Sequence, residues 1–157
     1  TGFLYVGLMI INNEPYLIEY NIRMGDPECQ VIVPRLKTDI ISIFNAASNN
    51  KINKLKIEWT KKKCMTIVLC SKGYPRKYIN NQKIRDVRKI NVDKNSFIFH
   101  DGTKFIKDNL ISNGGRVLNI TTTGNVFKKM RFKIFKMIKK INWKGGFFRK
   151  DIGWRVI

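Results

Sequence analysis

The sequence has 157 residues, of which 43% are hydrophobic and 11% aromatic, so it can build a packed core and is not a fully disordered chain. The length suits one ordinary domain or two small ones. Lys and Arg number 31 against 11 Asp and Glu, which gives a formal net charge of +20 and an isoelectric point of about 10.2.

The positive charge has two interpretations. One is nucleic-acid binding, for which a basic surface is the usual footprint. The other is codon drift, because Lys, Ile and Asn share A/T-rich codons and together supply 61 of the 157 residues. We favour drift, since Lys exceeds Arg by 22 to 9 and the lysines run from Lys37 to Lys150, whereas a nucleic-acid binder favours Arg for bidentate contacts.

The sequence gives little support to a membrane protein or to a zinc-binding protein. The longest uncharged apolar stretch is Phe3–Ile11, nine residues, whereas a membrane span needs ~20. No basic segment precedes it, so no secretory signal is predicted. Three cysteines without a C-x-x-C motif argue against a zinc site and a disulfide framework, and favour free thiols in a reducing cytosol. We therefore expect a cytoplasmic protein without a membrane partner.

The start of the chain predicts a β-hairpin. Residues 3–11 and 16–22 are rich in β-branched and aromatic types, and residues 12–15 between them have turn chemistry. A polar loop is expected over residues 23–30.

A helix and a domain boundary follow. Thr38 is a suitable N-cap for a helix over residues 39–48, where apolar side chains recur at helical spacing. The charge run Lys61–Lys63 marks a shift in composition. We therefore predict one domain over residues 1–60 and a second over residues 61–157.

The second domain is predicted to be rich in β-structure. The motifs Asp101–Gly102 and Asn113–Gly115 indicate hairpin connections. An apolar stripe over residues 126–141 predicts an amphipathic helix that covers the sheet, with its lysines in solvent, in preference to a membrane-surface segment. The strands are expected near residues 64–70, 96–100, 103–107, 109–112 and 116–122.

One short polar pattern carries the most chemical information. If residues 16–23 form a strand, the alternation of side chains places Glu19, Asn21 and Arg23 on one face at ~6.6 Å spacing. The other face would carry apolar side chains directed at a core, namely Ile18, Tyr20 and Ile22.

The first two of these polar side chains suit a metal ion. Carboxylate and amide oxygens are hard ligands for Mg²⁺, which keeps several waters and takes few protein ligands. Glu19 and Asn21 are therefore candidate ligands, and Arg23 offers a planar donor for a phosphate or carboxylate. From the spacing alone, an ordinary polar strand face remains the alternative.

The pattern Glu19-x-Asn21-x-Arg23 resembles the magnesium-binding signature of ATP-grasp ligases. Its continuation, Arg23–Gln30, resembles the phosphoribosylamine–glycine ligase family, also called the glycinamide ribonucleotide synthetases. The likeness covers essentially the whole chain, and the further motifs occur in the family's order. These motifs are Ser71-Lys72-Gly73-Tyr74-Pro75, His100-Asp101-Gly102-Thr103-Lys104, Asn113-Gly114-Gly115-Arg116-Val117-Leu118 and Phe148–Arg155.

The sequence departs from the family pattern at a few positions. Met24 replaces the usual Phe or Leu, Asp101 replaces Ala, and Arg76 replaces a Gly after Tyr-Pro. The helix over residues 126–141 is more basic than the family norm. These departures concern local packing and exposed positions.

The resemblance implies an ATP-dependent C–N ligation in purine biosynthesis. The carboxylate of glycine attacks the γ-phosphate of ATP to give glycyl phosphate, and the amine of 5-phosphoribosylamine then displaces phosphate. The cofactors are ATP and Mg²⁺ or Mn²⁺. By this likeness Glu19 and Asn21 are metal ligands, and Arg23 is a catalytic residue that contacts the nucleotide phosphate or the acyl phosphate. A loop on the substrate side would comprise Gly25, Asp26, Pro27 and Glu28.

The resemblance also implies the architecture. An α+β fold is expected, in which residues 1–60 are the last antiparallel strands and helix of an ATP-grasp domain. Residues 61–157 would be the small β-rich carboxy-terminal domain with one long covering helix. The family's amino-terminal half, with its adenine pocket and phosphate-binding lysines, would precede Thr1 and act as the partner of this chain. We therefore expect the isolated chain to be inactive.

Two alternatives stay open at this stage. The chain could be a stand-alone basic module that binds nucleic acid, although it has no RNP-like aromatic motif or Arg cluster. It could also be a decayed remnant or one half of a split gene. On the family interpretation no specific nucleic-acid partner is expected.

Overall fold

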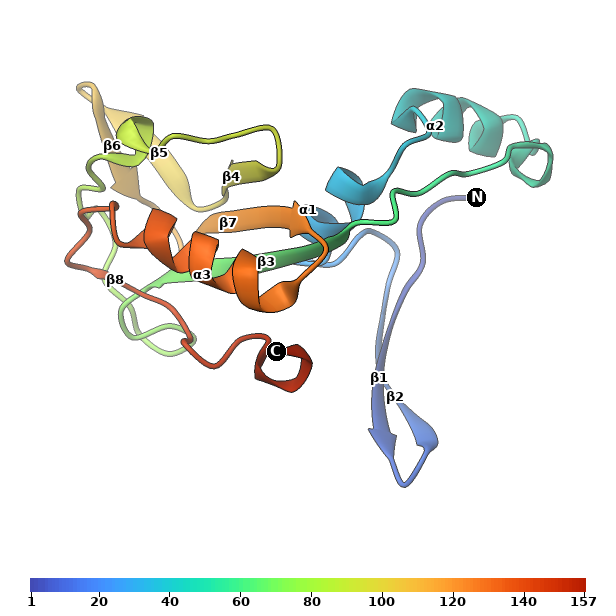
Figure 1. Cartoon of the computed structure of the whole chain (residues 1–157), viewed down its shortest axis with the longest axis horizontal. Helices are drawn as coiled ribbons and strands as arrows, with labels where there is room; N and C mark the ends of the chain where they lie inside the picture. The colour runs from blue at the N-terminus through green and yellow to red at the C-terminus, as the bar shows by residue number, and fades with distance from the viewer. The chain divides into compact units, whose positions relative to one another are not determined.

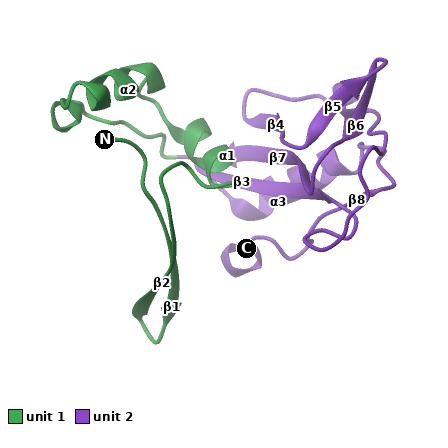
Figure 2. Ribbon diagram, turned by 180° about the vertical axis from the view of Figure 1, so that it is seen from behind, with its two compact units in different colours: residues 1–61 green, residues 62–157 purple.

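The computed structural model describes every residue from Thr1 to Ile157. The chain divides into two compact units, residues 1–61 and residues 62–157 (Figures 1 and 2). No helix in either unit combines the length and the apolar character that crossing a membrane requires.

The first unit begins with the expected hairpin. Strands β1 (Tyr5–Ile11) and β2 (Glu14–Asn21) pair antiparallel. Asn12 and Asn13 join them with φ values of 52° and 66°, the left-handed pair that a two-residue hairpin turn requires and that Asn tolerates. The turn is therefore shorter than the predicted residues 12–15.

The hairpin exposes its apolar side chains. Ile18, Tyr20 and Ile22 are 61%, 63% and 90% exposed. Their prediction as a core face is wrong for this chain, because a two-stranded sheet offers no further layer to cover them. The exposure is general to the unit, in which the only buried residues are Gly7 and Gly25.

Helix α2 (Ile40–Ser48) follows, with a different cap from the one expected. The carboxylate of Asp39 accepts the backbone N–H of Ser42 at 2.8 Å and so caps the helix. The Thr38 hydroxyl instead accepts the backbone N–H of Glu58 at 2.7 Å. Thr38 therefore ties the strand-like segment after the helix to the segment before it.

Short helical turns connect the hairpin to α2 and extend beyond it. Helix α1 (Cys29–Ile32) begins at the end of the loop predicted over residues 23–30 and continues as a 3₁₀ turn, Val33–Arg35. A second 3₁₀ turn, Ile52–Lys54, follows α2. Half-buried and exposed apolar side chains gather around a small hollow of about 80 Å³, lined by Phe3, Met24, Ile32, Val33, Leu36, Ile40, Ile43, Ile57 and Trp59.

The second unit contains a four-stranded antiparallel sheet and a separate hairpin, β5–β6 (Figure 1). The strand order in the sheet is β4-β7-β3-β8. The strands are β3 (Lys63–Ser71), β4 (Ser96–His100), β5 (Thr103–Ile106), β6 (Asn109–Ser112), β7 (Arg116–Gly124) and β8 (Gly146–Phe147).

The predicted hairpins at Asp101–Gly102 and Asn113–Gly115 are wrong. Strand β4 pairs with β7, and β5 pairs with β6 through a turn at Lys107 and Asp108, where φ is 44° and 61°. The glycines serve a close approach instead: a Cβ added to Gly102 would lie 2.7 Å from the Cα of Gly114. Absence of both side chains lets the two connections cross at the base of the hairpin.

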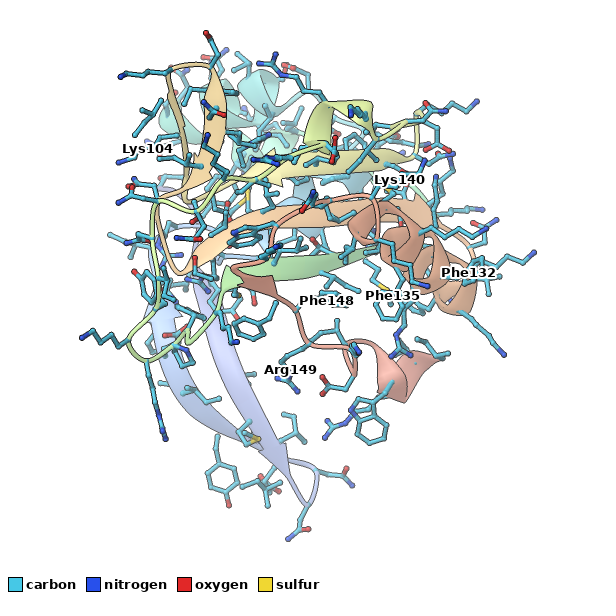
Figure 3. All side chains as sticks on the ribbon, turned by 90° about the vertical axis from the view of Figure 1, so that its left-hand side faces the viewer. Lys104, Phe132, Phe135, Lys140, Phe148 and Arg149 are labelled. Carbon is cyan, nitrogen blue, oxygen red and sulfur yellow. The ribbon has the colours of Figure 1, made fainter.

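Helix α3 (Phe127–Ile138) packs on β3 and β7, as the apolar stripe over residues 126–141 predicted (Figure 1). Phe135 on the helix lies beside Phe148 of the tail, with ring centroids 5.5 Å apart, whereas Phe132 is 62% exposed (Figure 3). Facing the sheet are the buried side chains Met130, Ile134, Met137 and Ile138. They meet β-strand residues that are also buried, among them Ile67, Leu118 and Ile120.

Candidate functional site

The Glu19 carboxylate and the Asn21 carboxamide lie together on β2. The two residues are two positions apart on one strand, and Asn21 Nδ2 donates to Glu19 Oε1 at 3.0 Å. The structure therefore brings together the two side chains that the alternation placed on one face.

Gly7 on β1 makes room for this pair. It lies opposite Glu19 in the strand register, and a Cβ at Gly7 would lie 3.1 Å from the Glu19 Cγ. The register shifts directly after Gly7, between Gly7 and Leu8. Sequence reasoning missed this position, although a glycine inside an apolar strand is a known signal of a bulge or a close approach.

Tyr5 connects the strand pair to the loop after it. Its hydroxyl donates to Glu28 Oε1 at 3.3 Å, and its partner across the hairpin is Asn21. The negative charge of Glu28 raises the pKa of Tyr5, with smaller contributions from desolvation, the hydrogen bond to Glu28 and the charge of Glu19. Both carboxylates therefore lie near one phenol, a contact that the sequence did not reveal.

Arg23 is placed differently from the prediction. Strand β2 ends at Asn21, so the strict alternation does not reach Arg23. The Arg23 guanidinium donates from Nη1 to the carbonyl oxygen of Met24 at 2.8 Å. It forms no ion pair with Glu19, and it lies in the bend that leaves the strand.

The loop predicted on the substrate side is internally braced. The Asp26 carboxylate accepts a hydrogen bond from Gln30 Nε2 at 3.1 Å, and the Cys29 N–H donates to the Gly25 carbonyl at 2.9 Å. The Glu28 carboxylate packs over buried Gly25, where any larger side chain would collide with it. These contacts hold the loop in one shape beside the end of β2.

The distance between the polar atoms of Glu19 and Asn21 can be compared with the distance between two ligands of one magnesium ion. Two adjacent ligands of an octahedral Mg²⁺ at ~2.1 Å lie ~3 Å apart, close to the observed separation of 3.0 Å. The Asn21 amide presents its nitrogen to Glu19, and a half-turn of the amide, whose torsion is roughly two-fold, presents its oxygen instead. No group of three or more His, Cys, Asp and Glu residues is assembled anywhere in the chain, so such an ion would take most of its ligands from water or substrate.

Comparison with known families bears on this site. The sequence profile described as "Phosphoribosylglycinamide synthetase, C domain" matches residues 64–155. The chain belongs to the phosphoribosylglycinamide synthetase family. The family's "ATP-grasp (A) domain" matches residues 1–29, a segment that contains Glu19, Asn21 and Arg23.

Individual relatives agree with the family assignment. The chain is 39% identical over all 157 residues to a phosphoribosylamine–glycine ligase of Brucella melitensis biotype 1, of which it covers 37%. It is 40% identical over 151 residues, 96% of the chain, to the ligase of Caldanaerobacter subterraneus, of which it covers 36%. The chain thus spans about 37% of the length of these curated relatives.

A solved structure confirms the fold class. The crystal structure of the phosphoribosylamine–glycine ligase of Thermotoga maritima superposes with a TM-score of 0.70 at 31% identity. The match covers 94% of this chain and 36% of that protein. The α+β architecture expected from the resemblance is therefore the one that the family has.

Proposed function

We propose that this chain is the carboxy-terminal part of an ATP-dependent ligase that joins glycine to 5-phosphoribosylamine. One observation carries the proposal: two domain profiles of one family match in order, the ATP-grasp domain over residues 1–29 and the C domain over residues 64–155. On this proposal residues 1–60 complete the ATP-grasp domain and residues 61–157 form the C domain.

The reaction has two displacement steps. A carboxylate oxygen of glycine attacks the γ-phosphorus of ATP, the bond to the β-phosphate oxygen breaks, and ADP leaves. The amine of 5-phosphoribosylamine then attacks the acyl carbon of glycyl phosphate, and inorganic phosphate leaves as the amide forms. Both steps build negative charge on phosphoryl oxygens, so cationic groups near these oxygens accelerate them.

The residues of this chain have separate roles in that scheme. Glu19 and Asn21 would hold Mg²⁺ or Mn²⁺, and such an ion would offset charge on the transferred phosphoryl group. Gly7 leaves room for Glu19, and Tyr5, opposite Asn21 in the strand register, bonds to Glu28 in the loop after the strand. Arg23 would exchange its bond to the Met24 carbonyl for a charge-assisted bond to a phosphate oxygen.

On this proposal the partner of the chain is the rest of the same enzyme. The chain spans 37% of its Brucella relative, and the adenine pocket and phosphate-binding lysines belong to the family's amino-terminal half on this proposal. The chain alone is therefore expected to make no glycinamide ribonucleotide. A chimera in which this chain replaces the aligned portion of the Brucella ligase is expected to make it.

The test compares two glutamates of β2 in that chimera. Glu19→Gln is expected to lower kcat/KM about a hundredfold or more, because a ligand charge is lost. Glu14→Gln is the matched control, since Glu14 is exposed at the other end of the strand. Measured on the isolated chain, the affinity for Mn²⁺ is expected to fall about tenfold for Glu19→Gln and to stay unchanged for Glu14→Gln. A folded but inactive chimera, or equal effects of the two variants, would contradict the proposal.

A further inference from the structure

A hollow of the second unit lies between residues 83–89 and the β5–β6 hairpin. Its volume is about 780 Å³, within the range of small-molecule sites. All of its walls come from residues 83–110, so it is independent of Glu19 and Asn21 in the other unit. Its chemistry is set by Lys83, Arg85, Arg88, Lys89, His100 and Phe105.

The backbone explains why these cations face outward. Ile84, Val87 and Ile90 recur at every third position and are 4%, 9% and 6% exposed, so they anchor the segment to the core. The Ile84 N–H also donates to the Leu110 carbonyl at 2.9 Å, which joins the segment to β6. Beside and between the anchors lie exposed cationic residues, namely Lys83, Arg85, Arg88 and Lys89, together with the half-buried Asp86.

The hollow keeps an excess of positive charge. Four cationic side chains line it, against the carboxylates of Asp86 and Asp108. Asp86 pairs with Lys89 at 2.7 Å, so these two charges offset each other. Lys83 and Arg85 form no ion pair in the structure. An anion in the hollow would therefore meet cations that no carboxylate has neutralised.

An aromatic platform lies beside these cations. Phe105 on β5 is 58% exposed, and the Arg88 guanidinium carbon lies 5.3 Å from its ring centroid. His100 and Thr103 border the same hollow, with His100 Nδ1 and Thr103 Oγ1 3.0 Å apart. An exposed ring next to guanidinium groups is a surface on which a nucleobase stacks while its phosphate is held.

We propose that this hollow binds a nucleoside monophosphate, with the base on Phe105 and the phosphate held by Arg85 and Lys83. The aromatic ring favours a base-bearing ligand over bare phosphate. A single platform favours a mononucleotide over a nucleic-acid strand, because proteins that bind single strands stack successive bases on successive aromatic rings. Such a site lies outside the ligase chemistry, because all of its walls come from the second unit.

The primary test is calorimetric binding of AMP to the full chain in EDTA and about 150 mM KCl. EDTA removes any metal-bridged binding at Glu19, so the result is separate from the ligase proposal. Arg85→Ala combined with Arg88→Ala is expected to weaken AMP about tenfold or more, because both guanidinium groups leave the hollow. Lys128→Ala on α3 with Lys140→Ala in the turn after it removes the same charge elsewhere and is expected to change the affinity less than about twofold.

A second variant tests the platform. Phe105→Leu is expected to weaken AMP about fivefold or more and to leave inorganic phosphate unaffected, because only the base contacts the ring. Because the Phe105 ring is exposed, the substitution should not destabilise the protein, and an unchanged melting temperature would verify that the variant is folded. Absence of AMP binding at about 1 mM would overturn the proposal. Equal losses of AMP affinity in the two double variants would also overturn it. So would an adenine oligonucleotide that binds far tighter than AMP and loses the same affinity in each double variant, because either result indicates diffuse charge attraction.

Discussion

The two units differ in both charge and burial. Residues 1–61 carry seven Lys and Arg against six Asp and Glu, a formal net charge of +1. Residues 62–157 carry 24 Lys and Arg against five Asp, a formal net charge of +19. Every buried hydrophobic side chain of the molecule also lies in the second unit. The charge that first suggested a property of the whole chain is therefore a property of one unit.

The difference in burial explains the difference in charge. If the lysines arose by codon drift, they would accumulate only where a side chain can reach water, and the second unit has a solvated surface around a packed core. The first unit instead exposes apolar side chains on both faces of its hairpin, such as Leu8 on one face and its neighbour Met9 on the other. Such positions tolerate no lysine if another part of the protein covers them. This pattern supports the proposed ATP-grasp partner.

The largest expected effect is on independent folding. Residues 62–157 expressed alone should fold cooperatively, with a melting temperature within about 5 °C of that of the full chain, because all buried apolar residues are retained. Residues 1–61 alone should show no cooperative transition and should aggregate, since the hairpin edges are unpaired. Circular dichroism melts and gel filtration check both expectations. A cooperative transition in residues 1–61 would contradict the conclusion that only the second unit has a core of its own.

An intermediate effect is expected from one substitution made in each unit. Ile120→Ala should lower the free energy of unfolding by about 2–5 kcal/mol, because Ile120 is fully buried between α3 and the sheet. Ile18→Ala should change it by less than about 0.5 kcal/mol, because Ile18 is 61% exposed. Urea denaturation measures both values. Similar costs for the two variants would show that the hairpin is covered in solution.

The smallest expected effect concerns pH. The Lys133 ammonium bonds to both carboxylate oxygens of Asp93 at 2.7 Å and, with further hydrogen bonds, lowers the pKa of Asp93 from 3.8 to about 2. Because the pKa is lower in the folded state, the stabilisation is present above about pH 4 and is lost as the pH falls towards 2.

The exposed setting of this pair keeps its contribution small. Asp93→Asn should therefore flatten the dependence of stability on pH between about 4 and 2 without a large change at neutral pH. Asp108→Asn, at the tip of the hairpin, serves as the control. An unchanged slope in the Asp93 variant would show that the ion pair does not form in solution.

The sequence predicted those features that depend on the pattern of side chains within one helix or strand. The apolar stripe on α3 and strands β3 to β7 follow from side-chain patterns, whereas the two-residue β8 is too short to have one. The Glu19–Asn21 contact follows from alternation along one strand. The N-cap was misplaced by one residue because Thr38 and Asp39 both qualify and the more distant Glu58 decides between them.

Contacts between distant segments could not be predicted in this way. The Asp-Gly and Asn-Gly motifs have the composition of hairpin turns, yet Gly102 and Gly114 meet because two remote connections cross. Tyr5 near Glu28 and Gly7 opposite Glu19 likewise depend on strand register. Exposure of Ile18 and Tyr20 depends on which other segments are present, and alternation within one strand carries no information on that.

The crossing at Gly102 and Gly114 makes the β5–β6 hairpin a side arm with a rigid base and a free tip. The base admits no side chain at Gly102 without displacing backbone, so insertions there should disrupt the sheet. Lys107 and Asp108 at the tip are exposed, and Lys104, nearer the base on β5, points away from the sheet (Figure 3). A fluorophore or affinity tag placed at the tip would leave the fold intact and lie at the rim of the hollow, where it could signal when a ligand enters.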